Sequence, residues 1–202
     1  MTTKEKILEV ADGLFHRVGI RSVSMDDIAR ELAISKKTIY QYVKDKDQIV
    51  QLVTQHHIDR EMREFDEVLE TSENALDELF RLSKCLRRNM SDINPSLLFD
   101  LQKYHPGSWD MWLSFKNEFI KNQVLRVIAR GKEEGFFRKE LHAEILAIFR
   151  IESIQLTFDQ RLFPKEKFDF TEIQLTIFDH FVHGLLTIKG QEIYDEMLTT
   201  TK

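Results

Sequence analysis

The chain has 202 residues, of which 42% are hydrophobic and 31% are charged, and its formal net charge is −5. These values are those of an ordinary soluble globular protein with one large or two small domains. A single cysteine, Cys85, excludes an internal disulfide framework. No apolar run approaches the roughly 18 residues of a membrane span, and residues 1–8 do not resemble a signal peptide. We therefore expect a cytoplasmic protein that makes no use of a membrane.

The charge is unevenly distributed along the chain. Residues 1–50 carry nine Lys or Arg against eight Asp or Glu, whereas the remaining residues carry 20 against 26. Four lysines fall within residues 35–46, where Asp45 is the one acid. The sequence thus places a small basic patch on an acidic body. Because an acidic body disfavours non-specific binding to nucleic acid, any such binding requires a local, oriented surface.

Four helices are predicted in the first seventy residues, from apolar positions at helical spacing and from the residues that flank them. The flanking signals are Gly19 after the first helix, Ser24 before the second, Ser35 before the third, and Asp45 before a fourth that extends toward Leu69.

Five further helices are predicted, at about 74–90, 95–104, 108–134, 140–161 and 170–198, and Gly190 marks a candidate break in the last. No segment alternates with period two between turns, so no sheet is expected. No flexible linker divides the chain, and the fourth helix is expected to belong to both halves.

The short helices that follow Ser24 and Ser35 are about three residues apart, which is the pattern of a helix-turn-helix whose second helix enters the DNA major groove. Residues 35–46 supply the hydroxyls and cations that suit phosphates and base edges. A Lys-rich turn between two core helices is the plainer alternative. The complete pattern is less common than such a turn and favours DNA binding. The candidate DNA-binding residues are Ser24, Ser35, Lys36, Lys37, Thr38, Tyr40, Gln41, Tyr42 and Lys46.

A specific signature runs through residues 4–50 and consists of Ile7, Ala11, Leu14, Phe15, Gly19, Ser24, Ile28, Ala29, Ser35, Lys36, Thr38, Tyr40, Tyr42, Lys46 and Ile49. In these positions the chain resembles the DNA-binding domain of the TetR family of bacterial transcriptional regulators. The resemblance implies that residues 35–42 are the recognition helix and that Tyr40 and Lys46 hold phosphates. It further implies that Lys36, Lys37 and Thr38 approach bases or backbone.

Three positions depart from the family pattern. Ala33 replaces the glycine common in the turn, Lys37 stands where glycine is frequent, and Val43 replaces a usual phenylalanine. The side chain of Lys37 reaches atoms that a glycine cannot, whereas Val43 is a conservative packing change. The resemblance also implies a homodimer and a divergent C-terminal domain that binds a small-molecule effector.

Aromatic residues are concentrated in the C-terminal part, which holds both tryptophans and fourteen of the fifteen phenylalanines. One group of aromatics is a candidate wall for a planar or apolar ligand, with a bulky helical core as the alternative. Pro106 and Gly107 interrupt this group, and a kink there would open a cavity. The candidate ligand-binding residues are Phe99, Tyr104, Trp109, Trp112, Phe115 and Phe119.

The last predicted helix is apolar on two faces, which indicates burial on both. Pairing with the helix at 140–161 would give a four-helix interface across a two-fold axis; a central helix of a monomer is the alternative. The candidate dimer residues are Ile148, Glu152, Gln155, Phe178, Val182 and Leu186.

The chain carries no phosphate-loop, dinucleotide, zinc-protease or nucleophile-elbow motif, so we expect no catalytic residue, metal or cofactor. The expected fold is all-α, with a three-helix helix-turn-helix domain over residues 1–46 and a larger helical bundle for ligand binding and dimerisation over 47–202. The predicted function is a ligand-responsive repressor that binds a palindromic operator in double-stranded DNA as a homodimer. The alternatives are an all-helical protein-interaction module and a helical-bundle enzyme.

Overall fold

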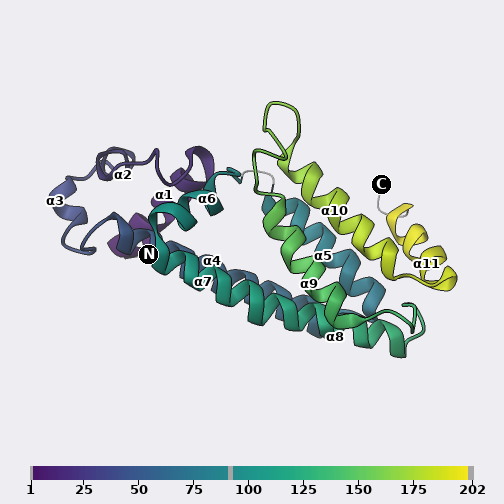
Figure 1. Cartoon of the computed structure of the whole chain (residues 1–202). Helices are drawn as coiled ribbons and strands as arrows, with labels where there is room; N and C mark the ends of the chain where they lie inside the picture. Colours follow the sequence, from purple (N-terminus) through teal and green to yellow (C-terminus); the bar gives the residue numbers. More distant parts are fainter. Residues whose placement is uncertain (1, 91–92, 200–202) are drawn as a thin grey trace.

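Helices account for nearly all of the regular structure in residues 2–90 and 93–199, which the computed structural model describes (Figure 1). One isolated bridge, between Phe137 and Leu186, is the sole β-type pairing in these residues. The elements are α1 (Thr3–Val18), α2 (Met25–Glu31), α3 (Lys36–Ile39), α4 (Lys46–Thr71), α5 (Ala75–Met90), α6 (Leu97–Tyr104), α7 (Pro106–Ser114), the π-helical η1 (Phe115–Ile120), α8 (Lys121–Glu133), α9 (Ala143–Leu156), α10 (Phe170–Leu185) and α11 (Ile188–Thr199). The predicted all-α class is confirmed. In the same residues, no helix combines the length and apolarity needed to cross a bilayer.

The predicted N-caps of α2, α3 and α4 are confirmed. The side chains of Ser24, Ser35 and Asp45 each accept a hydrogen bond from the backbone N–H three residues later. Such bonds satisfy amides that have no partner within the helix, and they fix where each helix begins. Together with α1, these helices enclose a core that contains the fully buried side chains Ile7, Phe15, Ile28, Ile39 and Ile49.

The recognition helix is shorter than predicted. Regular α-helix ends at Ile39, and the amides of Gln41 and Tyr42 bond to carbonyls three residues back, so the chain continues to Tyr42 in tighter turns. In the preceding turn, Ala33 has a φ of 53°, the left-handed region that favours glycine. An L-residue there costs roughly 1–2 kcal/mol, which explains why glycine is common at this position in the family pattern.

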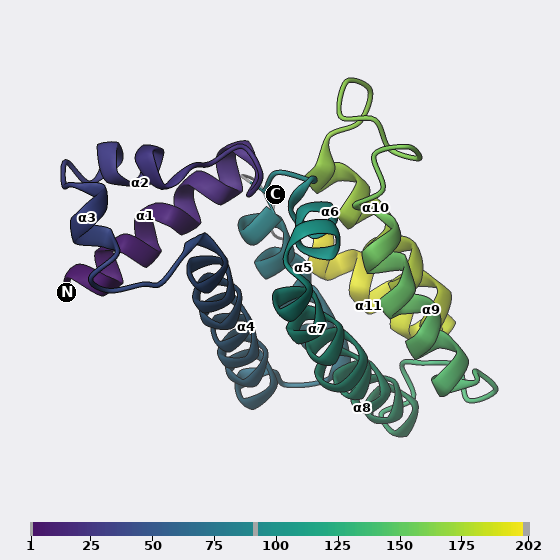
Figure 2. The same ribbon diagram turned by 60° about the vertical axis from the view of Figure 1, so that its left-hand side comes forward.

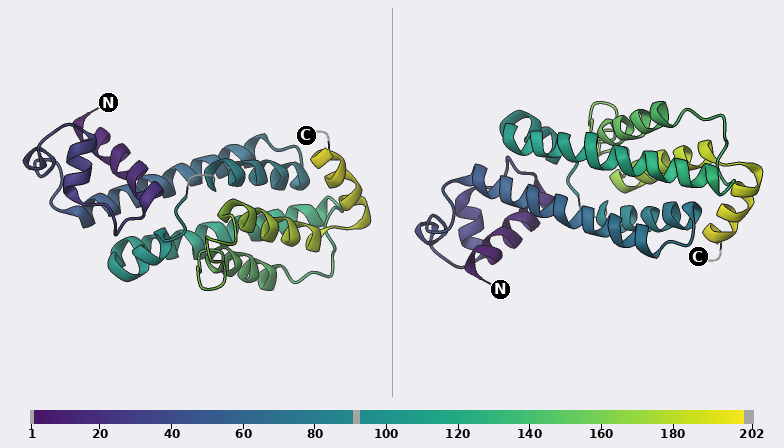
Figure 3. Two further views of the ribbon diagram at one scale, coloured as in Figure 1. Left: turned by 90° about the horizontal axis from the view of Figure 1, so that it is seen from above. Right: turned by 90° about the horizontal axis from the view of Figure 1, so that it is seen from below.

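Helices α1, α2 and α3 with the loops that join them are called the N-terminal unit below, and α4 leads from this unit into the rest of the molecule. Seen from above and below, α1–α3 lie at one end of an elongated molecule and α11 lies at the other (Figure 3). Helices α7, η1 and α8 follow one another without a break and run beside α4 (Figure 2). Pro106 is the first residue of α7, where its missing N–H is tolerated. The second core lies among α5, α8, α10 and α11 and includes Leu76, Ile128, Val182 and Tyr194.

The break in the last predicted helix falls earlier than expected. Leu186 adopts an extended backbone, the N–H of Thr187 donates to the carbonyl of Phe136 at 2.8 Å, and a new helix begins at Ile188. The break therefore exists because two residues pair with the segment after α8; the backbone freedom of Gly190 does not cause it. The predicted helix at 140–161 is also shorter, since regular structure ends at Leu156 and turns follow.

Candidate functional site

Residues 35–42, called the recognition segment below, have an outer face that presents Lys37, Tyr40, Gln41 and Tyr42. All four side chains are exposed. Ile39 and Val43 point the other way and are buried in the N-terminal core. The spacing of Ile39 and Val43 predicts this inward pair, because residues four apart share one face of a helix.

Other candidate DNA-binding groups already have partners in the structure. The ammonium of Lys36 donates to Asp26 Oδ2 at 3.0 Å, and this bond raises the pKa of Lys36. The hydroxyls of Ser35 and Thr38 lie 2.8 Å apart, and the hydroxyl of Ser24 donates to Asp27 Oδ2 at 2.7 Å. These four side chains stand at the helix starts that they stabilise, so a phosphate or base would have to share or displace those partners.

Lys46 faces inward. Its ammonium donates to the carbonyl of Ile20 at 2.6 Å, and burial lowers its pKa. Asp100 on α6 and Asp27 on α2 counteract part of this pKa shift by their negative charge. In this arrangement Lys46 joins the N-terminal unit to α4.

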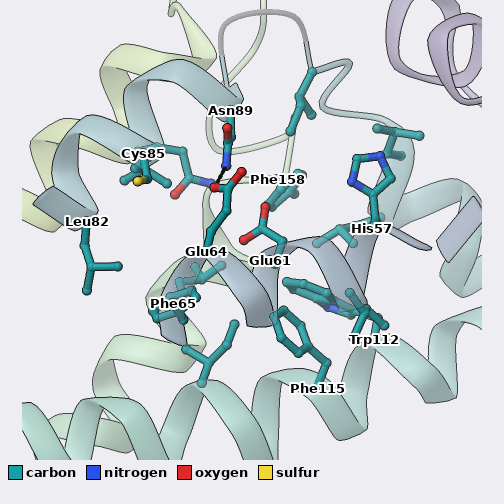
Figure 4. A pocket seen from close by; sticks show the side chains of 18 of the residues that line it. His57, Glu61, Glu64, Phe65, Leu82, Cys85, Asn89, Trp112, Phe115 and Phe158 are labelled. Carbon is teal, nitrogen blue, oxygen red and sulfur yellow. Dashed lines mark hydrogen bonds between the residues drawn. The ribbon is translucent and has the colours of Figure 1, made fainter. Parts of the chain in front are cut away.

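An elongated cavity of about 260 Å³ lies next to the N-terminal unit. Phe15, His16 and Ile20 of that unit contribute to its wall, and so do side chains from α4, α5, α6, α7, η1, α8, α9 and α10. The wall is mainly apolar, with acids on α4 as an exception: Glu61 and Glu64 project into the space shown in Figure 4. Burial raises the pKa of Glu61, and the neighbouring Glu64 raises it further. Glu64 accepts a hydrogen bond from Asn89 Nδ2 at 2.8 Å.

Two of the six predicted ligand-binding aromatics, Trp112 and Phe115, line this cavity. Phe119 stacks behind Phe115 with ring centres 5.5 Å apart, and Trp109 packs against the N-terminal core. The expectation for these two residues is corrected, because neither belongs to the cavity wall.

The expectation that Phe99 and Tyr104 line a ligand pocket is also corrected, since both side chains are exposed. The reason is the orientation of α6, which turns Leu98 and Leu101 toward the cavity and the N-terminal core. Residues next to that inward face then point to solvent. Sequence reasoning missed the aliphatic and acidic side chains of the wall, because no local motif separates them from ordinary core residues.

A carboxylate joins α1 to α4 at the edge of the cavity. Asp12 Oδ1 lies 2.8 Å from His57 Nε2 and 2.9 Å from His16 Nδ1. These contacts hold the pKa of Asp12 well below its usual range despite burial, while the pKa of His16 is raised and burial lowers that of His57.

The same three residues offer ligand atoms within 4.8 Å of one another, a spacing that a metal ion would accept. The guanidinium of Arg60, however, lies 2.7 Å from His57 Nδ1. Because a guanidinium only donates, Nδ1 accepts, and the proton of a neutral ring sits on Nε2, facing Asp12. The arrangement is therefore a hydrogen-bonded hub between two helices.

Helix α6 also contacts the N-terminal unit. The backbone N–H of Arg21 donates to Asp100 Oδ2 at 2.9 Å, and just before α6 the backbone N–H of Asn94 donates to the carbonyl of His16 at 2.9 Å. Since α6 also lines the cavity through Leu97, Leu98 and Leu101, one short helix touches both the cavity and the N-terminal unit.

The predicted dimer residues fall into two groups. Ile148 and Glu152 on α9 are exposed and Gln155 is half-buried, whereas Phe178, Val182 and Leu186 are buried in their own bundle. The expectation for the last three is corrected, because α5, α8 and α11 of the same chain cover them. The large exposed apolar side chains of α9 are Ile145, Ile148, Phe149 and Leu156.

Capped short helices with an exposed recognition segment, followed by a cavity-bearing helical bundle, define a helix-turn-helix transcriptional regulator. Residues 7–53 match the family model described as "Bacterial regulatory proteins, tetR family". The chain is 30% identical over 169 residues to the HTH-type transcriptional regulator YvaF of Bacillus subtilis strain 168, which covers 81% of this chain and 86% of that protein. The chain belongs to the TetR family. It is therefore a DNA-binding transcriptional regulator and not an enzyme.

Solved structures share the fold at lower identity. A TetR-family regulator from Agrobacterium tumefaciens aligns with a TM-score of 0.76 and 16% identity, covering 91% of this chain and 97% of that one. A regulator from Saccharomonospora viridis, solved in complex with choline, aligns with a TM-score of 0.72 and 21% identity over the same shares.

Lys37→Ala tests base recognition, because this lysine is exposed on the recognition segment and no contact is recorded for its ammonium within the described residues. We expect a loss of about 1–3 kcal/mol on the preferred duplex and a smaller loss on duplexes changed at one base pair. Fluorescence anisotropy over a panel of single-base variants measures both. Lys139→Ala, an exposed lysine after α8, is the control. A uniform loss across the panel, with a shallower salt dependence, would show that Lys37 contacts only phosphate.

Asp12→Asn tests the hub between α1 and α4. Asp12 favours the protonated form of His16, whose pKa is raised, whereas burial lowers the pKa of His57, whose neutral ring donates from Nε2 to Asp12. The pH-dependent part of the Asp12 contribution therefore requires an ionised carboxylate and a protonated His16 imidazole. The stabilisation that comes from the lowered pKa of Asp12 is present above pH 3.8, the ordinary pKa of Asp, and is lost as the pH falls toward the lower pKa of Asp12 in the folded protein. The stabilisation that comes from the raised pKa of His16 is present below pH 6.5, the ordinary pKa of His, and is lost as the pH rises through the raised pKa of His16 in the folded protein.

We therefore expect Asp12→Asn to lower the free energy of unfolding by about 2 kcal/mol near pH 5 and by less near pH 8. Urea denaturation at the two pH values measures the difference. Asp66→Asn, an exposed acid on α4, should change neither value. An effect that is independent of pH would contradict the role of the histidines.

Proposed function

We propose that this regulator is a repressor that binds a palindromic operator near a promoter as a homodimer and leaves it when a small molecule occupies the cavity. Residues 1–46 bind DNA, residues 47–202 bind the effector and the partner subunit, and the protein acts in the cytoplasm. The observation that carries the proposal is the shared wall of the cavity. Side chains of α1 and of the helical bundle line the same space, so an occupant touches the DNA-binding unit directly.

DNA contacts are assigned to the exposed side of the recognition segment. Lys37 and Gln41 face the base edges, whereas Tyr40 and Tyr42 bring hydroxyls to the phosphates. Ser24, Ser35, Lys36 and Thr38 take part at the helix starts, where N–H groups favour anions. Lys46 contributes mainly by holding the loop at Ile20 against α4.

Dimerisation is assigned to the exposed face of α9. Ile145, Ile148, Phe149 and Leu156 form an apolar stripe on a helix whose opposite side is already buried. Exposed Glu152, which pairs with Lys116, lies between Phe149 and Leu156 on this side of the helix. A large exposed apolar surface marks an interaction site. In a two-fold dimer the stripe of one chain packs against the same stripe of its partner, and a two-fold protein reads an inverted repeat.

Effector response is assigned to the cavity and α6. A molecule between α4 and α6 pushes against Leu98 and Leu101, and α6 passes the displacement to the N-terminal unit through Asp100 and the backbone of Arg21. The regulator from S. viridis was solved with choline; we extend to this chain small-molecule binding, and not choline itself. Coupling of this kind is reciprocal, so operator DNA weakens effector binding by the factor by which the effector weakens DNA binding.

Selection from a random duplex library at near-physiological salt tests the operator and the dimer together. We expect enrichment of an inverted repeat by the wild type.

Phe149→Glu tests the assigned dimer interface. In this variant a charge replaces a side chain that is 52% exposed in one chain and that the dimer would bury. We expect a monomer in light scattering and a loss of at least about tenfold in operator affinity.

Ile188→Glu is the matched control, because Ile188 is 83% exposed and lies on α11, outside the proposed interface. It should remain dimeric and bind normally. Enrichment of a single half-site, or a dimeric Phe149→Glu, would refute the assigned interface. A folded wild-type protein that enriches no sequence would favour the protein-interaction alternative.

Labelling of Cys85 tests whether filling the cavity releases DNA. This thiol is the only one in the chain and lines the cavity, and burial raises its pKa, so the reaction is run near pH 9. A benzyl methanethiosulfonate reagent attaches an apolar group through a disulfide. We expect operator affinity to fall by roughly 5- to 150-fold, the range typical of allosteric coupling, and to return after reduction. Cys85→Ser should be indifferent to the reagent. Complete labelling with unchanged affinity would refute the coupling.

A further inference from the structure

Helix α9 turns one charged side chain into the cavity wall. Arg150 is only 6% exposed and lines the cavity. Its guanidinium carbon lies 5.2 Å from the ring centre of Phe178 and 6.0 Å from that of Phe181. Within the described residues its N–H groups donate one hydrogen bond, to Ser153 Oγ at 3.3 Å on the same helix. No acid forms an ion pair with it in the part of the chain that the structure describes.

Other arginines near the cavity are neutralised. The buried carboxylate of Glu78 accepts hydrogen bonds from Arg126 and Arg130, at distances between 2.5 and 3.3 Å. Arg130 also pairs with Glu134 at 2.8 Å. Arg126 and Arg130 thus hold helices together through ion pairs with acids. Arg150 differs from them because no acid of the described residues pairs with it.

The charge of Arg150 persists despite its burial. Desolvation lowers its pKa to about 10, so the group is protonated at neutral pH, and no acid contributes to the shift. The two aromatic faces compensate part of the lost hydration. They leave most of the five N–H donors without an acceptor, and a buried charge without a counter-ion is strongly unfavourable.

We propose that the effector is an amphiphilic anion, an apolar molecule with one carboxylate, and that this carboxylate pairs with Arg150. This inference rests on the proposed role of the cavity as the effector site. A carboxylate matches a guanidinium because two parallel N–H groups meet two oxygens. The apolar body lies along the rest of the wall, where Leu79, Phe115 and Val127 contribute carbon surface.

The acids of the cavity explain why the anionic group would occupy the Arg150 position. Glu61 and Glu64 project from α4 (Figure 4), and their ionised forms disfavour an anion beside them. Neither contributes to the pKa shift of Arg150, which burial alone produces. His16 and His57 also line the cavity but already contact Asp12, so among the described lining residues Arg150 is the cationic group that no acid pairs with.

Three ten-carbon probes with different head groups test the charge preference: decanoate, 1-decanol and decylamine. Trp112 lines the cavity, so tryptophan fluorescence reports binding. We expect the wild type to bind decanoate at least tenfold more tightly than either other probe. Arg150→Met keeps an apolar side chain of similar length without the charge. It should bind decanoate roughly 10- to 100-fold more weakly and bind decanol within threefold of the wild type.

Thermal melting without any probe separates a ligand anchor from a structural role. Removing a buried charge that has no counter-ion should raise the melting temperature in Arg150→Met. Arg130→Met removes an arginine that is paired with Glu78 and should lower it. A lower melting temperature for Arg150→Met would overturn the view that its charge is uncompensated.

Equal binding of decanoate and decanol by the wild type, or a decanoate preference that survives Arg150→Met, would overturn the proposal. Tightest binding of decylamine would overturn it as well and assign the head group to Glu61 and Glu64, with the cavity still the effector site. No binding of any probe would overturn the anionic amphiphile. The Cys85 experiment then decides separately whether the cavity controls DNA binding.

Discussion

Helix α4 belongs to two cores at once, and the rest of the structure depends on this constraint. Ile49, Val50 and Val53 in its first turns are buried in the DNA-binding core. Further along, Ile58 and Phe65 line the cavity, and Val68 is buried near its end. A continuous helix of 26 residues is about 39 Å long. Because a hydrogen-bonded helix resists bending, α4 is the element through which the proposed effector would reorient the recognition segment.

Polar contacts tie the remaining helices to this shared element. His105 Nδ1 lies 2.7 Å from Asp47 Oδ1 on α4 and so fixes the start of α7. Asp12 joins α1 to His57, and Lys46 joins the loop at Ile20. These bonds are directional and couple neighbouring elements, whereas the wall of the cavity between them is mainly apolar. Apolar contacts have no fixed direction, so the proposed two-state regulation would rearrange the cavity wall while the polar contacts keep the elements joined.

The sequence was most informative where the structure depends on local rules. The caps at Ser24, Ser35 and Asp45, the inward pair Ile39 and Val43, and the family signature all follow from neighbours within a few residues. The position of the break before Ile188 could not be predicted, because it arises when Leu186 and Thr187 pair with Phe136 and Phe137, about fifty residues away.

The same physical reason explains the errors at the cavity. Aromatic density between residues 99 and 119 predicted a pocket, but the orientation of α6 depends on which leucines meet the N-terminal core, and no local pattern encodes that choice. Of the six candidates in this stretch, Trp112 and Phe115 therefore reach the cavity, while Phe99 and Tyr104 face solvent. The other aromatic residues of the wall, Phe15, Phe65, Phe158, Phe178 and Phe181, come from outside the stretch. The dimer candidates show a related limit, since an apolar face at Phe178 and Val182 could be buried by the chain itself or by a partner.

Buried charges are treated differently in the permanent contacts between helices and in the wall of the cavity. Where the chain needs permanent contact, as between α5 and α8, a buried acid meets two arginines. Where the wall is open to an occupant, Arg150 keeps a charge that no acid among the described residues neutralises, and burial raises the pKa of Glu61. The charged form of Arg150 is less stable there than it would be in water, so a ligand that neutralises it gains free energy beyond that of its apolar contacts. Only a ligand whose affinity differs between two arrangements of the helices can shift the balance between them. In the proposed complex Arg150 on α9 would supply that difference, because its distance to the ligand anion would change with any movement of α9 relative to α4.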